Sequence, residues 1–102
     1  MASNIAYTGI LSSRAQKEIT QAWEWYEDRQ QTLGDRFVKE VINKIRVIVQ
    51  NPERYPTRYK SYKETSVNIF PFLIIYRISH KKKSVRIVSV FHTSLNPSKK
   101  YK

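Results

Sequence analysis

The sequence predicts an α+β fold whose elements follow the order β-α-α-β-β-β. Two stretches in the first half of the chain repeat their apolar residues at helical spacing. Two runs rich in Ile, Val, Phe and Tyr, at residues 70–78 and 85–93, flank a polar, lysine-rich turn, a pattern typical of an antiparallel hairpin. At 102 residues the chain has room for one modest core, and we expect a single domain over residues 1–102.

The first two elements are a short strand and a helix. Residues 5–11 are apolar and predict a strand, although Gly9 weakens it. Ser13 and Gln16 have the spacing of a capping box, in which each side chain serves a free amide at a helix start. The helix is expected over roughly residues 14–31. Its apolar face is formed by Ala15, Ile19, Ala22, Trp23 and Tyr26.

A second helix follows after Leu33 and Gly34 interrupt the first, and Asp35 is placed to cap it. Its apolar side chains fall within an arc of about 140°. They are Phe37, Val38, Val41, Ile42, Ile45, Ile48 and Val49. Pro52 ends the helix because it offers no amide and restricts the residue before it. Two amphipathic helices joined by a short break form a hairpin that must bury its apolar faces against another element.

Strands fill the second half of the chain. Residues 53–60 are expected to be a polar linker, residues 61–69 a strand, and Pro71 a turn or bulge. If the last hairpin pairs Ile78 with Val85, Arg77 lies opposite Arg86. The arginines then share a face with Leu73, Ile75, Val88, Val90 and His92. The other face, expected under the helices, holds Phe72, Ile74, Tyr76, Ile78, Val85, Ile87 and Phe91. A slip of one residue would exchange the two faces.

Charge and composition limit the class of function. The net charge is +11, and residues 80–102 contain no acidic residue. This asymmetry indicates a basic binding face for a polyanion or an acidic partner, the alternative being a solubilising surface. The absence of cysteine excludes thiolate chemistry, and two distant histidines make a metal site or a cofactor unexpected. No segment approaches the apolar length of a membrane span, so we expect no membrane contact and a cytoplasmic location.

Three residues have the chemistry for cleaving RNA. His92 is a candidate general acid or base, with a hydrogen-bonded residue at a strand end as the alternative. Arg77 and Arg86 are candidate phosphate clamps. Because like charges facing each other destabilise a sheet, an anion is expected between them, either Glu64 or Glu53 or an external group. Candidate residues for binding nucleic acid or a partner are Arg58, Lys60, Lys63, Lys81, Lys82, Lys83, Lys99, Lys100 and Tyr101. Tyrosines 55, 59, 62 and 101 lie among these bases, either as stacking platforms or as cover for a small core.

Several segments in this order resemble the RelE/ParE superfamily of toxins, the plasmid stabilization proteins of bacterial type II toxin–antitoxin systems. The segments are Ala22-Trp23-Glu24-Trp25-Tyr26, Leu33-Gly34-Asp35-Arg36-Phe37, Asn51-Pro52-Glu53-Arg54-Tyr55-Pro56, Phe70-Pro71-Phe72-Leu73-Ile74-Ile75-Tyr76, Val90-Phe91-His92-Thr93 and Asn96-Pro97. The resemblance implies a helical hairpin packed on one face of an antiparallel sheet. It also implies growth inhibition, and neutralisation by a small, acidic cognate antitoxin encoded by the adjacent gene.

The superfamily contains two activities, and the resemblance alone does not decide between them. Some members are ribosome-dependent mRNA endonucleases, and ParE-like members poison DNA gyrase by binding. Nuclease members similar in this region usually have an arginine where this chain has Leu73, and Thr93 replaces the usual tyrosine beside His92. We therefore expect a ParE-like binding poison. The alternatives are a ribosome-dependent mRNA endonuclease, which would make the chain an enzyme, and a non-toxic basic module that binds nucleic acid.

Overall fold

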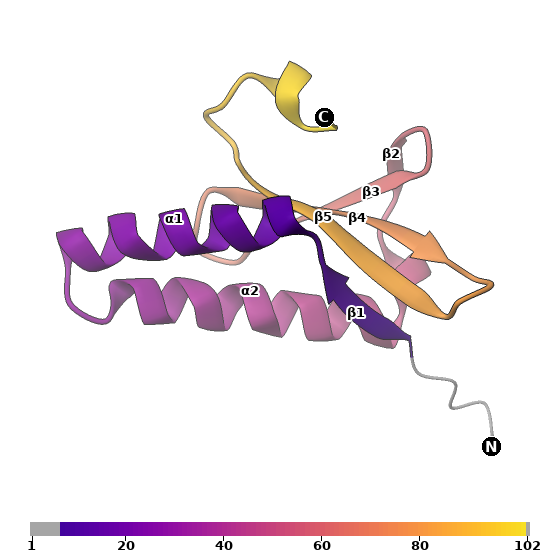
Figure 1. The fold of residues 1–102 in the computed structure, drawn as a ribbon, viewed down its shortest axis with the longest axis horizontal. Helices are drawn as coiled ribbons and strands as arrows, with labels where there is room; N and C mark the ends of the chain where they lie inside the picture. Colours follow the sequence, from indigo (N-terminus) through magenta and orange to yellow (C-terminus); the bar gives the residue numbers. More distant parts are fainter. Residues whose placement is uncertain (1–6, 102) are drawn as a thin grey trace.

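In a computed structural model, which describes residues 7–101, two helices lie against a five-stranded mixed sheet (Figure 1). The strand order is β1-β5-β4-β3-β2. The elements are β1 Thr8–Leu11, α1 Ser13–Arg29, α2 Leu33–Gln50, the short 3-10 helix η1 Pro52–Arg54, β2 Thr57–Tyr59, β3 Tyr62–Ser66, β4 Phe72–Ser79, β5 Ser84–His92 and the 3-10 helix η2 Pro97–Lys99. The α+β class and the predicted order are confirmed, with the short strand β2 added inside the predicted linker.

The sheet is mixed because its first strand runs parallel to its last. β1 pairs in parallel with β5, while β2, β3, β4 and β5 pair antiparallel in succession. The antiparallel sheet implied by the resemblance therefore needs this correction at one edge. Two parallel strands need a long crossover connection, usually a helical one, and α1 and α2 are part of that connection here. Ile5 and Ala6, predicted to begin the first strand, lie outside the described residues, as does Lys102.

The core lies between the helical hairpin and one face of the sheet. Its largest fully buried side chains come from α2, β4 and β5, and they include Phe37, Val41, Ile48, Ile74, Tyr76, Val85, Ile87 and Val90. At one end of this layer the rings of Tyr26, Phe37, Phe70 and Phe72 pack together with centroids 4.8–6.3 Å apart. None of the helices within residues 7–101 has the length and apolarity needed to cross a membrane.

Both predicted helix caps differ from the structure. Ser12, not Ser13, caps α1, because its Oγ accepts a hydrogen bond from the Ala15 amide at 3.0 Å. At the start of α2 the Asp35 side chain accepts instead from the Trp23 indole, at 2.9 Å. The amides of α2 are served from the preceding helix, since the Glu27 carboxylate accepts from the amide of Gly34 at 2.8 Å. A carboxylate at a helix N-terminus is favoured by the helix dipole as well as by the free amides.

The predicted register of the last hairpin is confirmed only near its turn. Ile78 pairs with Val85 and Arg77 with Arg86. Tyr76 then pairs with Ile87 but Ile75 pairs with Ser89, so Val88 is the extra residue of a β-bulge. Beyond Val88 the two faces of β5 are exchanged relative to the prediction. Val90 and His92 therefore point to the helix side, and Phe91 points away from it, which corrects the sequence-based assignment of all three.

The C-terminal segment, residues 93–101, covers part of the second face of the sheet. Figure 1 shows this segment on the opposite side of the sheet from α2. Lys100 binds Glu64, the register partner of Ile75, at 3.3 Å. Ile75, Ser89 and Phe91 lie on this face and are nevertheless almost fully buried. The sheet thus has helices over one face and the chain's own tail over part of the other.

Candidate functional site

The paired arginines lie on the second face of the sheet, where the tail leaves it open. Arg77 on β4 and Arg86 on β5 are directly opposite each other, and both side chains are exposed. Within residues 7–101 neither arginine forms an ion pair with a carboxylate. Directly opposed like charges destabilise an antiparallel pair, and an anion placed between them removes that cost. The pair is therefore a ready site for an external anion.

The internal anions predicted for this pair have other partners. Glu53 lies 3.4 Å from the ammonium of Lys63 and 3.0 Å from the imidazole Nε2 of His80. Glu64 accepts from Lys100 and from the hydroxyl of Tyr101. The interpretation in which Glu64 or Glu53 neutralises the arginine pair is therefore wrong.

Three tyrosine rings stack beside the arginine pair. The ring of Tyr59 lies 4.6 Å from that of Tyr101 and 6.4 Å from that of Tyr62, with planes inclined by 20° and 12°. The Tyr62 and Tyr101 centroids are 5.0 Å apart. The Arg77 guanidinium lies 5.4 Å from the centroid of Tyr62, within the range of a cation–π contact. We call Tyr59, Tyr62, Tyr101, Arg77 and Arg86 the tyrosine–arginine face.

Tyr101 lies on this face because Glu64 on β3 binds two residues of the tail. The Tyr101 hydroxyl donates a hydrogen bond to Glu64, and Lys100 pairs with the same carboxylate at 3.3 Å. Burial, followed by the hydrogen bond to the Glu64 carboxylate, raises the pKa of Tyr101 to about 12. The phenol is neutral near neutral pH, as an ordinary tyrosine is, and its hydroxyl is engaged in the hydrogen bond to the Glu64 carboxylate.

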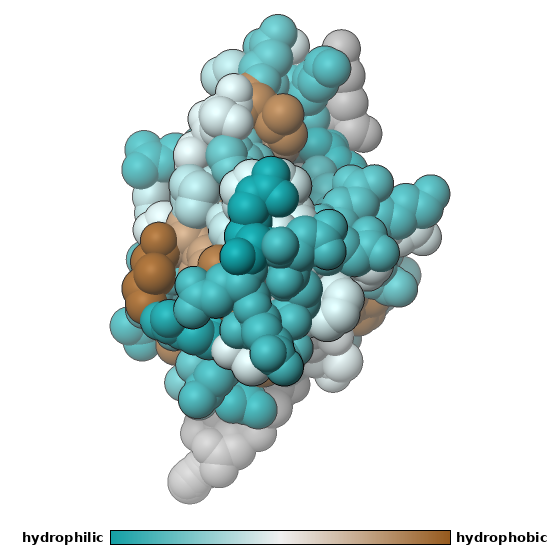
Figure 2. Space-filling model, turned by 90° about the vertical axis from the view of Figure 1, so that its left-hand side faces the viewer, coloured by the Kyte–Doolittle hydropathy of each residue, from teal (hydrophilic) through white to brown (hydrophobic). Residues whose placement is uncertain are grey.

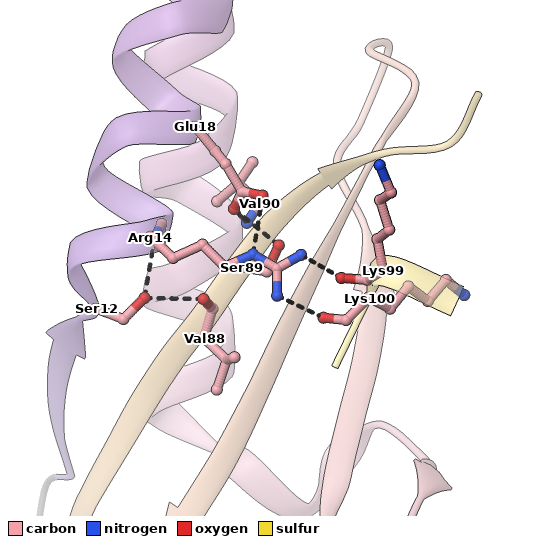
Figure 3. A network of polar contacts seen from close by, with 9 residues as sticks. Ser12, Arg14, Glu18, Val88, Ser89, Val90, Lys99 and Lys100 are labelled. Atoms are coloured by element: carbon pink, nitrogen blue, oxygen red, sulfur yellow. Dashed lines mark hydrogen bonds and ion pairs between the residues drawn. The ribbon is translucent and has the colours of Figure 1, made fainter. Parts of the chain in front are cut away.

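A second attachment joins the tail to α1. The Arg14 guanidinium donates to the carbonyl oxygens of Lys99 and Lys100 at 2.6 and 3.0 Å (Figure 3). Its Nε also pairs with the Glu18 carboxylate at 3.2 Å. Glu18 in turn accepts from the Ser89 hydroxyl at 2.8 Å and from the Val90 amide at 2.9 Å, where β1 has ended and the edge of β5 is free. One charge pair on α1 thus connects the helix, the last strand and the tail.

His92 lies on the other side of the sheet from the arginine pair. Its ring is 4.8 Å from that of Phe72, and it lines a cavity of about 430 Å³ together with Trp25, Tyr26 and Leu95. Its Nδ1 accepts from the Ser94 amide at 3.0 Å, which leaves Nε2 as the nitrogen able to serve a ligand. The structure therefore does not bring the three candidate catalytic residues together. A hydrogen-bonded histidine at a strand end was the alternative interpretation, and it describes this geometry.

The cavity lies near exposed apolar side chains. Trp25 and Leu95, which border it, are 52% and 49% exposed. Figure 2 views the molecule from the end where α1 and α2 are joined, and shows a mostly hydrophilic surface broken by separate apolar patches. Apolar groups left exposed beside a hollow are typical of surfaces that bind another protein.

The predicted basic residues fall into three groups. Lys81, Lys82 and Lys83 form the turn between β4 and β5, Arg58 and Lys60 lie on β2 and in the turn after it, and Lys99 and Lys100 belong to the tail. Lys63 differs from the others because its ammonium is turned inward. It donates to the Tyr55 carbonyl and the Thr57 hydroxyl at 3.0 and 3.2 Å, and its side chain is only 12% exposed.

Two residues of the site were missed from the sequence. The spacing of Arg14 and Glu18, four residues apart on a helix, was a visible signal for an ion pair. Nothing in that spacing indicates that the pair reaches a tail more than eighty residues away in the chain. Within residues 7–101 no group of three histidine, aspartate or glutamate side chains is arranged to hold a metal ion.

Comparison with known proteins identifies the fold and the family. No curated protein matches the chain by sequence. The chromosomal ParDE system of P. aeruginosa contains a chain with 11% identity and a TM-score of 0.74, and the match covers 87% of this chain and 98% of that one. The E. coli RelBE toxin–antitoxin complex matches with 18% identity, a TM-score of 0.67 and coverage of 85% and 96%. The RelBE2 complex of Mycobacterium tuberculosis matches with 16% identity, a TM-score of 0.64 and coverage of 85% and 98%.

Sequence identities this low establish the fold alone. The family follows from a separate comparison, in which residues 10–97 match the model of the ParE toxin of the type II toxin–antitoxin system parDE. This match covers far more than half of the chain, and it confirms the predicted membership of the RelE/ParE superfamily. The chain belongs to the ParE toxin family and is the toxin of a type II toxin–antitoxin system.

Proposed function

We propose that this toxin inhibits DNA gyrase by binding to it and performs no chemistry of its own. The observation that supports the proposal is the separation of His92 from the arginine pair by the β-bulge at Val88. Cleavage of RNA by its own 2′-hydroxyl needs a base, an acid for the leaving oxygen and cations on the same phosphate. Here the titratable imidazole and the two guanidinium groups lie on opposite faces of the sheet, so no single phosphate reaches all three.

The position of Leu73 supports the same proposal. Leu73 lies on the face of Arg77 and pairs with Phe91, so this end of the face is apolar. The nuclease members that the chain resembles usually have an arginine there. The cations of the face are thus confined to the end near the hairpin turn, where they suit binding to an acidic surface.

A cognate antitoxin is the second partner that we propose. The three structural neighbours come from ParDE and RelBE toxin–antitoxin systems, and two of them are complexes of toxin and antitoxin. A net charge of +11 favours rapid association with an acidic segment, and the rate should fall as salt rises. The test co-expresses a tagged toxin with the untagged product of the adjacent reading frame and purifies the toxin by its tag. The antitoxin should co-purify. A neighbour that never co-purifies would contradict it.

The test of the target uses two assays on the same purified protein. One measures supercoiling by DNA gyrase, and the other maps new 5′ ends on a message translated in vitro. We expect inhibited supercoiling and no new 5′ ends. His92→Gln, which keeps a polar side chain of similar size at the cavity, should inhibit gyrase as well as the wild type does.

Ribosome-dependent 5′ ends that vanish in His92→Gln would contradict the proposal and favour the endonuclease, because removing a general acid or base costs about 10²–10⁴-fold in rate. A soluble protein that inhibits neither gyrase nor translation nor bacterial growth would favour the non-toxic basic module.

A further inference from the structure

We propose that the toxin contacts DNA gyrase through an apolar ridge formed by Trp25, Ile69 and Leu95. Trp25 lies near the C-terminal end of α1, Ile69 in the turn between β3 and β4, and Leu95 in the tail. Their exposed fractions are 52%, 74% and 49%. The inference rests on the proposed function, and it names the surface by which the toxin binds its target.

Ile69 supports the proposal because its conformation costs stability while its side chain packs little against the rest of the chain. Its φ is 75°, in the left-handed region that a β-branched residue enters only under strain. Within residues 7–101 positive φ also occurs at Thr32, Lys60 and Lys83, but their side chains are polar. Only Ile69 among these four combines strain with an exposed apolar group. Such strain indicates a contact outside the molecule from which the protein benefits.

The turn that contains Ile69 adjoins both α1 and the tail. The next residue, Phe70, packs its ring on that of Tyr26 in α1, with centroids 5.0 Å apart. The carbonyl oxygen of Pro71 accepts from the amide of Thr93, the first residue of the tail, at 2.9 Å. Ile69 is therefore fixed where the β3–β4 turn, the end of α1 and the tail meet.

The other two members of the ridge are also held in place. The Arg29 guanidinium lies 3.9 Å from the centroid of the Trp25 ring, and the Tyr26 ring meets that ring edge-on at 5.2 Å. The Leu95 amide donates to the His92 carbonyl oxygen at 3.1 Å. Trp25 and Leu95 border the same cavity of about 430 Å³, which can accept a side chain of a partner. Side chains fixed before binding lose little conformational freedom in a complex, and tryptophan is among the residues that dominate protein–protein contacts.

The charges around the ridge decide which partner it fits. Residues 65–76 and 88–98, from which two of its members come, contain no lysine, arginine, aspartate or glutamate. Residues 1–34, which supply the third, carry three bases and four acids in a chain of net charge +11. An acidic antitoxin finds no complementary charge here, and two copies of so basic a chain repel each other. The ridge therefore fits an apolar surface of another protein, and gyrase is the target in the proposed function.

The test measures gyrase supercoiling and thermal unfolding with Ile69→Asn. Because asparagine enters the left-handed region more readily than isoleucine, the variant should unfold at the same temperature as the wild type or at a higher one. The concentration that half-inhibits supercoiling should rise about tenfold or more, as expected when a central interface residue is removed. Trp25→Ala should weaken inhibition to a similar degree. Ile69→Leu, which keeps an apolar group of the same size, should inhibit nearly as well as the wild type.

The matched control is Ile42→Asn, which replaces an isoleucine that is 43% exposed on α2. Its backbone is helical and asparagine is a poorer helix former than isoleucine, so this variant should unfold at a lower temperature. It should inhibit gyrase as well as the wild type does, because Ile42 lies outside the ridge. The two variants thus separate the loss of a contact from the loss of stability. An equal loss of inhibition in Ile42→Asn would overturn the proposal.

Binding of the toxin to immobilised gyrase over a series of salt concentrations tests the apolar character of the contact. Salt screens charge pairs and leaves apolar contacts in place, so the Kd for gyrase should rise less with salt than the Kd for the antitoxin. A steep rise that disappears in Arg77→Ala with Arg86→Ala would mean that the arginine pair binds gyrase, and it would overturn the proposal.

The remaining outcomes distinguish this inference from the proposed function. Full inhibition of gyrase by Ile69→Asn overturns the inference and leaves the proposed function intact. If that variant fails to co-purify with the antitoxin but still inhibits gyrase, the ridge belongs to the antitoxin and the inference is wrong. A changed oligomeric state in sedimentation, with inhibition unchanged, would assign the ridge to a second copy of the chain and would also overturn it. A wild-type toxin that does not inhibit gyrase overturns the proposed function and this inference with it.

Discussion

Removal of the Glu18 carboxylate should destabilise the protein more than a substitution at any exposed position on α1 does. Its Oε1 accepts from the hydroxyl of Ser89 and the amide of Val90, which are 0% and 1% exposed as residues. In Glu18→Ala both donors lose their partner, and each buried donor left unpaired costs about 1–3 kcal/mol. The ion pair with Arg14 is partly exposed and adds at most about 1 kcal/mol. We expect a loss of about 3 kcal/mol from a free energy of unfolding of about 5–15 kcal/mol.

Urea denaturation followed by circular dichroism measures this loss, and two variants show its origin. Glu18→Gln keeps an oxygen for Ser89 and Val90 and loses only the charge, so it should cost about 1 kcal/mol or less. Glu24→Ala, on the exposed side of the same helix, should cost only about 0.5 kcal/mol or less. A Glu18→Ala variant that is no less stable than Glu24→Ala would refute the role assigned to this carboxylate at the free edge of β5. Equal losses in the Ala and Gln variants would mean that the charge, and not the hydrogen bonds, stabilises the fold.

Two further predictions concern the helical hairpin and the tail. Gly34→Ala should destabilise the protein by about 1–3 kcal/mol or more, because an added Cβ would lie 2.6 Å from the Trp23 carbonyl oxygen. Thermal unfolding measures this, with Gly9→Ala as the milder control, since its Cβ would meet only side-chain methyl groups, the nearer at 3.2 Å. The raised pKa of Tyr101, about 12 against an ordinary 10.0, means that the folded state favours the neutral phenol. Its stabilisation is therefore complete below about pH 10 and is lost as the pH rises from about 10 to 12. Over that pH range the free energy of unfolding of the wild type should fall by more than that of Tyr101→Phe. Equal decreases in the two proteins would contradict the raised pKa of Tyr101.

The helices and the class of fold were readable from the sequence because they depend on local patterns. Apolar spacing located α1 and α2 to within about three residues at each end. Their caps were misread because the capping groups come from a neighbour or from elsewhere in the fold. Ser12 rather than Ser13 takes the cap, and it also binds the Val88 carbonyl of β5 at 2.8 Å. Glu27 caps α2 from the other helix. Capping partners that come from other elements depend on tertiary packing, and no local sequence motif predicts them.

The prediction of the candidate site failed because it missed the bulge at Val88. The bulge decides which side chains share a face with the arginine pair. The arginine pair was predicted correctly because it lies close to the hairpin turn, where register is set by the turn itself. Alternation of apolar and polar side chains does not locate the bulge, because Ile87, Val88, Val90 and Phe91 are all apolar and their inward and outward positions look alike. The extra residue Val88 turns His92 towards the helices and Phe91 away from them. A face that an unbroken strand would have equipped for acid–base chemistry is left with cations and aromatic rings. The face keeps the arginine pair, whose cations suit the binding of an anion, and the imidazole that would have to act with them lies on the opposite side of the sheet.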